Sequence, residues 1–423
     1  MLFRILKLTC ACLVVVSVVS CAPSGSLTPT APAPTVSPVP TAVPSPTVPP
    51  TPTDIPKPND YIVIGQLNLW YHGPGCYGGF EQYNCSGKRS TPFTPALGAT
   101  YDSSDPSVVK QQIDWAAAYG VDAFSIEWTT PRGVGGSLEN NLDDAFLKAP
   151  NLDKIRWCIF YDLELRILQT PGLHVDLSQG MDFDNPDVYN TFVADFDHFA
   201  QKYFSQAQYL KIDGRPVVYI WGTWNARGNF AGAFQEARKR AADRGYDVFI
   251  VGDIIRTDAF NSKLAASYDA NTNFVFLIPG LPTYADVGAT APAVDRALGN
   301  WQNHIKGLMV TGRQDLVNLE PGFTPQFDNR QFCAGAGNTN CIYVPATSKD
   351  QVTAMANVAI KYAQPVGSQG WKLIWLNTWN NWAEATTVEP TIEQGPKYPA
   401  GNYQFDLLEV IRDVFGAETF STK

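Results

Sequence analysis

Residues 376–390 read LNTWNNWAEATTVEP and combine two kinds of side chain that can act on a sugar. Trp379 and Trp382 supply indole rings, and the face of an indole stacks well against the C–H face of a pyranose. Glu384 and Glu389 supply carboxyl groups, and a carboxylic acid can protonate a glycosidic oxygen. The composition of this segment therefore indicates carbohydrate chemistry.

Acidic and aromatic side chains also follow several apolar runs elsewhere in the chain. A single Trp in such a position usually packs at a rim and a single Asp often caps a helix, so the prediction depends on their coincidence. We predict that the chemistry is carried by Glu384, Glu127 and Asp162. Substrate binding is predicted for Trp70, Tyr71, Trp128, Glu164, Trp221, Trp224, Asn225, Asp253, Trp379, Asn380, Asn381, Trp382 and Glu389.

The elements that must position these side chains alternate between short apolar runs and helical patterns. Expected strands are residues 61–69, 121–126, 155–161, 216–221, 247–251, 274–278, either 307–311 or 315–319, and 372–376. Expected helices are residues 106–119, 190–204, 232–244, 291–306, 349–363 and 404–415. Eight strands alternating with helices are typical of an α/β fold of the (β/α)8 TIM-barrel type, whose active site lies at the C-terminal ends of the strands.

Two other classes of site are not indicated. No G-x-G-x-x-G or G-x-x-x-x-G-K-[ST] loop follows any expected strand, which weighs against a nucleotide-binding fold. The four histidines are scattered, and neither C-x-x-C nor H-x-x-x-H spacing occurs. We therefore expect no metal and no cofactor.

The first 58 residues are not expected to belong to the folded domain. Arg4 and Lys7 precede a short apolar run, which is typical of a signal peptide over residues 1–20. Residues 18–21 (VVSC) resemble a bacterial lipobox, which implies lipidation of Cys21, whereas an ordinary secretory signal is the alternative. Residues 21–58 hold 13 of the 32 prolines and should form an extended tether. We expect an extracytoplasmic lipoprotein, anchored to the membrane of a bacterium.

The remaining segment, residues 59–423, has the length of one large barrel domain with inserted loops. It carries 28 basic and 39 acidic side chains once Arg4, Lys7, Lys57 and Asp54 are set aside, a formal charge of −11. An acidic exported domain is a poor partner for nucleic acid. Eleven Trp residues exceed the needs of a core and favour a carbohydrate partner. We expect a monomer.

Cysteine usage agrees with export. Cys76 and Cys85 lie in one Gly-rich loop and Cys333 and Cys341 in another, and we predict one disulfide within each pair. Cys158 falls in the apolar run 155–161 and is expected to be a buried free thiol.

The segment that opens this section resembles a known family. Its sequence WNNWAE, followed by VEP at 388–390, is similar to the W-N-E-W-x-E-G-x-x-[IL]-E-P signature of glycoside hydrolase family 99 and its relatives, among them family 71-like enzymes and bacterial WbsX-type proteins. Weaker similarities are the pair 70–71, the segment 120–124 that leads to residues 127–128, and the segment 213–219. The resemblance implies a (β/α)8 barrel that cleaves α-mannosidic bonds with retention, and it assigns the general acid/base to Glu384.

The chain departs from the signature at Asn381. In the family, a Glu at this position removes the proton of the sugar 2-hydroxyl, but an amide cannot accept a proton at neutral pH. Three interpretations stay open. Another carboxylate does this work, from among Glu127, Asp162, Glu164 and Asp253, with Glu127 best placed by the resemblance; or the barrel binds glycans without cleaving them; or Asn381 orients a 2-substituent, such as an N-acetyl group, that itself acts as nucleophile.

Glu384 and Glu389 each have a structural alternative. Glu384 could form a salt bridge to an arginine such as Arg215, and Glu389 with Pro390 could simply fix the end of the loop. We favour an exported, lipid-anchored glycoside hydrolase, endo-acting on α-linked mannan or glucan. The alternative is a non-catalytic glycan-binding lipoprotein with the same aromatic cleft. A glycosyltransferase, which the WbsX name suggests, is disfavoured because no nucleotide-sugar loop is recognisable.

Overall fold

The structure is a computed structural model that describes residues 61–72, 93–98, 100–134, 138–177, 180–223, 226–253, 262–272, 291–292, 294–296, 299, 318–328, 343–344, 349–393 and 404–416. The predicted signal peptide and tether, with Cys21, lie outside these residues, as do Cys76, Cys85, Cys333 and Cys341. In the described part of the chain no helix has the length and apolar character needed to cross a bilayer.

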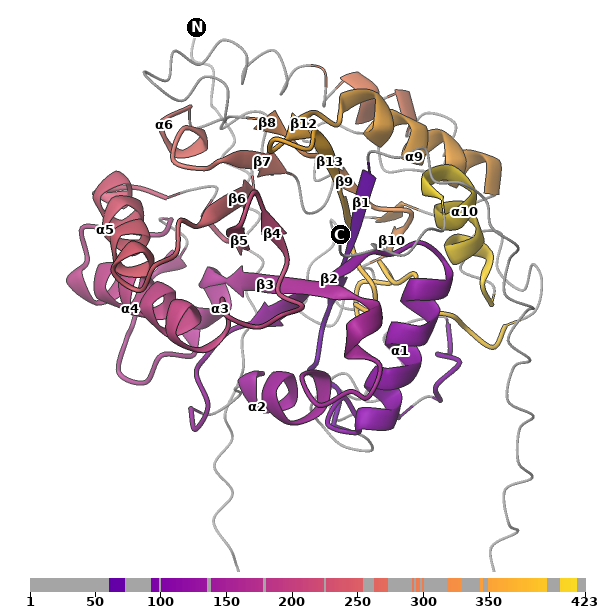
Figure 1. The fold of residues 1–423 in the computed structure, drawn as a ribbon, viewed down its shortest axis with the longest axis horizontal. Helices are drawn as coiled ribbons and strands as arrows, with labels where there is room; N and C mark the ends of the chain where they lie inside the picture. The colour runs from indigo at the N-terminus through magenta and orange to yellow at the C-terminus, as the bar shows by residue number, and fades with distance from the viewer. Residues whose placement is uncertain are drawn as a thin grey trace, which may run out of the picture. The chain divides into compact units, whose positions relative to one another are not determined.

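Eight strand positions form a parallel sheet (Figure 1). In sheet order they are β13 (Trp371–Leu376), β1 (Tyr61–Leu67), β2 (Ala123–Trp128), β3 (Arg156–Asp162), β5 (Arg215–Trp221), β6 (Phe249–Asp253), β7 (Ala270–Thr272) and β8 (Asn318–Leu319). Every neighbouring pair in this order is parallel. The expected strand 274–278 lies outside the described residues, and β7 stands just before it.

The sheet closes through the short segment 318–323. Its first strand, β8, pairs with β7, and its second, β9 (Gly322–Phe323), pairs with β13 at the other end of the order. Glu320 lies between the two strands, is fully buried and accepts a hydrogen bond from the Leu373 backbone N–H at 2.8 Å. The result is the expected (β/α)8 barrel, with the alternative strand 315–319 represented by β8.

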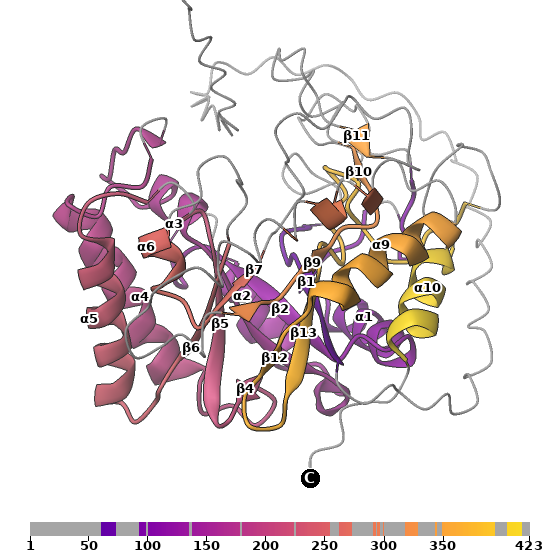
Figure 2. The same cartoon turned by 90° about the horizontal axis from the view of Figure 1, so that it is seen from above.

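Helices follow most strands, as a barrel of this type requires. They are α1 (Pro106–Ala118), α2 (Glu139–Asn141), α3 (Leu163–Leu168), α4 (Pro186–Lys202), α5 (Phe230–Asp243), α6 (Ser262–Ala265), α9 (Lys349–Tyr362) and α10 (Asp406–Phe415), with a π-helical turn at Leu142–Phe146 and a 3-10 turn at Leu152–Lys154. Short antiparallel strands are β4 (Lys211–Ile212), β10 (Phe327–Asp328), β11 (Tyr343–Val344) and β12 (Pro365–Val366). Figure 2 shows α4 and α5 together on one side of the strands and α9 and α10 on the other.

The long helices begin where capping residues allow. Asp105 accepts a hydrogen bond from the Ser107 N–H, and Asn185 accepts one from the Asp187 N–H. A proline follows each cap at the first helical position, where its missing N–H costs nothing. This chemistry starts α4 at Pro186, four residues before the helix expected from apolar spacing.

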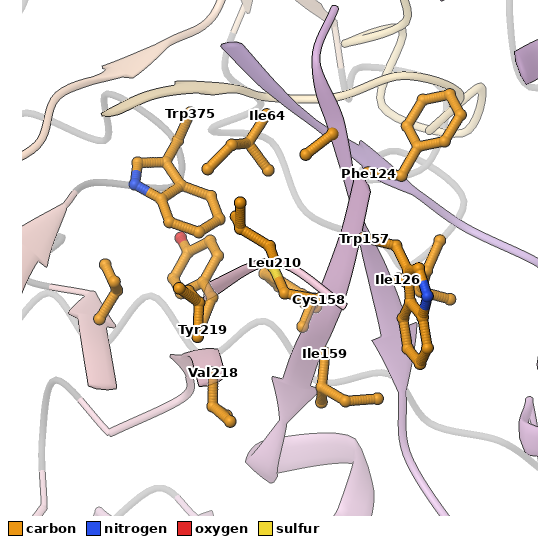
Figure 3. Packing of buried hydrophobic residues seen from close by; sticks show 14 of the residues in the cluster. Ile64, Phe124, Ile126, Trp157, Cys158, Ile159, Leu210, Val218, Tyr219 and Trp375 are labelled. Atoms are coloured by element: carbon orange, nitrogen blue, oxygen red, sulfur yellow. The ribbon is translucent and has the colours of Figure 1, made fainter. Parts of the chain in front are cut away.

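Side chains on each strand alternate between the barrel interior and the helix layer. Tyr219 on β5 and Trp375 on β13 are not on neighbouring strands, yet their ring centroids lie 4.7 Å apart, so both point into the barrel. Phe160 lies 4.8 Å from Tyr219 and shares this face. Figure 3 shows Tyr219 beside Trp375 and away from Trp157, which packs outward on Tyr203. Cys158 is a buried free thiol, as predicted.

Candidate active site

The register of the strands gathers three acidic residues at the C-terminal end of the barrel. Glu127 pairs with Phe160, and Asp162 pairs with Trp221, two residues beyond Tyr219 on the same face of β5. Because Phe160 and Tyr219 point inward, Glu127 and Asp162 also point into the barrel. Asp253 ends β6 one position beyond the Ile220–Gly252 pair and so reaches the same level.

The same alternation corrects the prediction for Trp128. A residue next to an inward-facing Glu127 must face outward, and the indole of Trp128 is fully buried against Phe199, with ring centroids 4.7 Å apart. Its Nε1–H donates to Glu139 at 3.4 Å. Trp128 therefore belongs to the contact between barrel and α4 and offers no face to a sugar.

The loop after β13 is tied to the end of β1 by Asn380. The Asn380 Oδ1 accepts the Asn68 N–H at 2.8 Å, and its Nδ2 donates to the Asn68 carbonyl at 2.9 Å. The Tyr71 hydroxyl donates to the Asn380 carbonyl at 2.7 Å and accepts the Trp382 N–H at 3.1 Å. Asn380 and Tyr71 were both predicted to bind substrate. Both are buried, and their polar groups form the hydrogen bonds that hold this loop.

Glu389 is a second anchor of this loop. Its Oε2 accepts hydrogen bonds from the Trp382 Nε1–H and the Tyr101 hydroxyl, each at 3.0 Å. Its Oε1 accepts from the Gln112 Nε2 at 2.8 Å. Since Glu389 and Trp382 are both fully buried, these residues hold the loop in place, and the predicted contacts of Glu389 and Trp382 with substrate are wrong for this arrangement.

Of the other predicted aromatic residues, two keep some exposure. Trp379 is fully buried, with its ring 5.1 Å from that of Phe124, and is a core residue rather than a sugar platform. Trp70 and Trp221 are only partly buried. Trp224 and Asn225 lie outside the described residues.

Glu384 is partly buried and is oriented by Asn381. The Asn381 Nδ2 donates to the Glu384 Oε2 at 2.9 Å, and the Asn381 Oδ1 accepts the Glu384 N–H at 3.3 Å. Burial raises the pKa of Glu384 to about 7, while the hydrogen bond from Asn381 opposes that rise. One N–H of the Asn381 amide and one lone pair of its oxygen are thus used to hold Glu384.

Arg215, the arginine considered as a salt-bridge partner of Glu384, pairs with other residues. Arg215 pairs with Asp269 at 2.9 Å and with Asp247 at 3.0 Å, beside the start of β6. That position is at the opposite end of the barrel strands from Glu384.

Glu384 and three further residues form a group that we call the acidic cluster: Glu127, Asp162, Glu164 and Glu384. Burial and the neighbouring charges of Asp162 and Glu384 raise the pKa of Glu127 well above its ordinary value. Burial, then the charge of Glu164, raises the pKa of Asp162 to about 8, against hydrogen bonds from backbone N–H groups. Burial alone raises the pKa of Glu164 to about 7. No cation enters these balances, so burial and like charge favour protonated carboxyl groups throughout the cluster.

Asp162 also has a structural role. Its Oδ1 accepts the Leu165 N–H at 2.8 Å and caps α3, the helix whose first turn carries Glu164. Gly222, at the end of β5, allows this turn to approach, because a Cβ there would lie 2.9 Å from the Glu164 nitrogen. Gly222 is not among the predicted site residues, although it directly follows an expected strand and is next to Trp221 in the sequence.

Asp253 lies beside the cluster but has a different environment. It is fully buried, and the Tyr219 hydroxyl donates to its Oδ2 at 3.4 Å. The structure thus brings together most of the acidic residues predicted for the site, with Asp253 at the level of Asp162 on β6.

A family model described as Glycosyltransferase WbsX matches residues 181–400, which are 220 of the 423 residues. None of the curated proteins matches the chain.

Two solved structures share the fold over most of their length. A glycoside hydrolase-like protein has a TM-score of 0.62 and 17% identity, covering 86% of this chain and 97% of its own. A GH99 endo-alpha-mannosidase from Bacteroides thetaiotaomicron, in complex with Bis-Tris propane, has a TM-score of 0.53 and 15% identity, covering 84% of this chain and 95% of its own. At these identities the likeness establishes the (β/α)8 fold.

Proposed function

This chain belongs to the WbsX family, within a superfamily that includes glycoside hydrolase family 99, and we propose that it is a glycoside hydrolase. The observation that carries the proposal is Glu384, a partly buried carboxyl group with a pKa of about 7, whose charge helps to raise the pKa of Glu127 on another strand at the C-terminal end of the barrel. A protonated acid and a second carboxyl group on another strand are the two parts that glycoside hydrolysis needs.

In this proposal Glu384 donates its proton to the glycosidic oxygen as the C–O bond breaks. Glu127, in its ionised form, takes a proton from a water molecule that attacks the anomeric carbon, so a new C–O bond to water forms as the bond to the leaving oxygen breaks. It thus serves as the base that the chain lacks at Asn381. Asn381 is a positioning residue, because it donates to one oxygen of Glu384 and accepts from its backbone. The proposal adopts the first of the three interpretations of Asn381.

Hydrolysis is favoured over glycosyl transfer from a nucleotide sugar. A nucleotide sugar carries a diphosphate, which cations, helix N-termini or backbone N–H groups bind. The acidic cluster offers the opposite charge, and the pKa shifts of its four members have no cation among their causes. Glycosyl transfer, the activity that the WbsX name suggests, is therefore poorly suited to the acidic cluster at the C-terminal end of the barrel.

We further propose that the enzyme is exported and held at the membrane by lipid on Cys21, with an α-linked mannan or glucan as substrate. The signal-like residues 1–20, the lipobox at 18–21 and the proline-rich tether support this location. Replacement Cys21→Ala should move the protein from the membrane fraction to the soluble fraction. A variant that stays membrane-bound would count against the anchor.

The hydrolase is tested by incubating the full chain with α-mannans, α-glucans and host-type glycans and analysing the products. Glu384→Gln and Glu127→Gln should each lower kcat on an unactivated glycan by about 10²-fold or more. Glu384→Gln should keep more activity on an aryl glycoside whose leaving group needs no proton. Glu236→Gln on the surface of α5 removes one carboxylate elsewhere and serves as control. Unchanged turnover by Glu384→Gln on the unactivated glycan would remove the acid assignment.

A non-catalytic glycan-binding protein is the second candidate, and Asn381 is the observation that favours it. A binding protein has no use for a base at this position. However, Trp128, Trp379 and Trp382 are buried, so the aromatic cleft expected for such a protein is much reduced. Glycan binding without products from any substrate would support this second function.

A further inference from the structure

The acidic cluster holds more carboxyl groups than hydrolysis uses. In the proposed function Glu384 and Glu127 suffice, which leaves Asp162 and Glu164 beside them. One carboxyl oxygen of Asp162 accepts the hydrogen bond that caps α3. Glu164 is partly buried, and its carboxyl group has no hydrogen-bond or ion-pair partner within the described residues. Burying carboxyl groups together costs free energy, so an arrangement of this kind calls for a compensating ligand.

Glu127 gives an independent sign that the cluster receives a ligand. Its side chain is 2% exposed, and its Oε2 has no hydrogen-bond partner in the part of the chain that the structure describes. It points inward between Asp162 and Glu384, whose charges both act on it. A buried carboxyl oxygen normally has a donor, and here a bound molecule can supply it.

A metal ion does not fit the spacing of these groups. Ca²⁺ takes six to eight oxygen ligands, and Mg²⁺ demands octahedral geometry. Among the described residues no three His, Cys, Asp or Glu side chains stand close enough together to hold a metal ion. The carboxyl groups are neighbours, but they do not all reach a single atom. The compensating ligand must therefore be able to bind them from separate hydrogen-bond donors.

A protonated primary amine meets that requirement. An ammonium group has three donors that can serve separate acceptors, and it does not need a closed coordination shell. Trp221, partly buried and paired in register with Asp162, adds an indole at the same level of the barrel. An ammonium group is also attracted to the face of an indole.

We propose that the mouth of the barrel recognises a glycan bearing a free amino group, that is, an amino sugar without its acetyl group, with Glu164 and Asp162 as the groups that bind the amine. This inference rests on the proposed function, since it names the substrate class of the same site. The positive charge of the amine would also favour the ionised form of Glu127, so the second carboxyl group becomes a base when substrate is bound. The titratable groups that interact with Glu127 in this step are Asp162, Glu384 and the Tyr71 hydroxyl.

Binding of matched sugars to the full chain tests the proposal. Isothermal titration at pH 7 and low salt compares the methyl α-glycosides of glucosamine, galactosamine and mannosamine, each with its neutral 2-hydroxy and N-acetyl counterparts. In at least one series the amine should bind roughly tenfold more tightly, as expected for one charge-assisted hydrogen bond. Glu164→Gln should reduce this preference at least threefold, whereas Glu236→Gln on α5 should keep it.

The outcomes separate this proposal from the hydrolase. If all three series bind within threefold of their neutral counterparts, the amine proposal is wrong, even where neutral glycans are cleaved. If amines are preferred but no glycan is cleaved, the hydrolase is wrong and the amine site stands. A preference that survives in a folded Glu164→Gln protein, with unchanged thermal unfolding, would overturn the role of Glu164.

Discussion

Asn381 and Glu384 act as one unit at the scale of single residues. Two hydrogen bonds join them, one to the carboxyl group and one to the backbone of Glu384. Burial raises the pKa of Glu384 to about 7, and the donor from Asn381 opposes this rise because it stabilises the ionised form. The amide that replaces the family's base thus tunes the acid beside it.

This pairing predicts the pH dependence of turnover. A general acid works only while protonated, so kcat should fall as pH rises through about 7 in the native enzyme. Asn381→Ala removes the opposing hydrogen bond, so the pKa of Glu384 should increase and the basic limb of the profile should move to higher pH, with a lower kcat. Asn151→Ala, whose amide binds Asp114 and the Lys110 carbonyl, is the control and should leave the limb in place. A limb that stays fixed in Asn381→Ala would contradict the coupling.

For Glu389 we predict an effect on the stability of the fold and not on the reaction. Glu389→Ala removes the carboxyl group that accepts hydrogen bonds from the Trp382 Nε1–H, the Tyr101 hydroxyl and the Gln112 amide, in a fully buried place. Loss of a buried acceptor and of side-chain volume should lower the free energy of unfolding by about 3 kcal/mol or more, measured by urea denaturation. Glu236→Ala on the surface of α5 should change it by less than about 0.5 kcal/mol. An equal decrease in the free energy of unfolding in the two variants would contradict the structural role of Glu389 and favour a contact with substrate.

At the scale of elements, the position of α3 depends on Gly222. Gly222 has a φ of +87°, and a Cβ there would lie 2.9 Å from the Glu164 nitrogen and 3.1 Å from its Cβ. Gly245 has a similar φ of +90° but open space around it. An alanine at either position is strained because of the positive φ. Only the alanine at position 222 would also displace α3.

Gly222→Ala should lose about 1–3 kcal/mol more stability than Gly245→Ala, because the added methyl group overpacks the contact with the first turn of α3. It should also weaken ligand binding at the mouth, since Glu164 and the cap at Asp162 move with the helix. Urea denaturation and ligand titration of the two variants measure these differences. Equal stability and equal binding would show that α3 tolerates the displacement.

The apolar runs were enough to predict which segments form strands and helices. They were not enough to predict the direction in which a single side chain points. The barrel and the acidic residues at its strand ends follow from the alternation of strands and helices. Residues 127 and 128 are neighbours on one strand, so only one of them can face the interior, and the sequence alone does not tell which. For Trp382 and Glu389 the sequence shows an indole beside a carboxyl group. Their burial depends on Tyr101 and Gln112, which lie far away in the chain and carry no local signal.

For the whole molecule, two sets of carboxyl groups respond to pH in opposite ways. Partial burial raises the pKa of Asp114, but hydrogen bonds from Lys110 and Lys154 outweigh it and lower that pKa, and hydrogen bonds from Lys148 and Arg132 lower the pKa of the exposed Asp144. Such groups stabilise the fold above pH 4 and lose that effect in acid. Burial raises the pKa of Asp162 to about 8 and those of Glu384 and Glu389 to about 7. A raised pKa means that the folded state binds protons more tightly than the unfolded chain does, so this set stabilises the fold at low pH.

The buried set should dominate between pH 5 and pH 8, because the surface set is already ionised in both folded and unfolded chains there. The folded state binds more protons than the unfolded chain over this range, so the free energy of unfolding should fall as pH rises, and Tm should be several degrees higher at pH 5 than at pH 8. Glu320→Gln should flatten the decline, since burial also raises the pKa of Glu320 well above its ordinary value. Thermal unfolding at constant ionic strength measures both effects. A Tm that increases from pH 5 to pH 8 would mean that these carboxyl groups are ionised in the folded protein, and the case for a protonated acid at Glu384 would lose its physical basis.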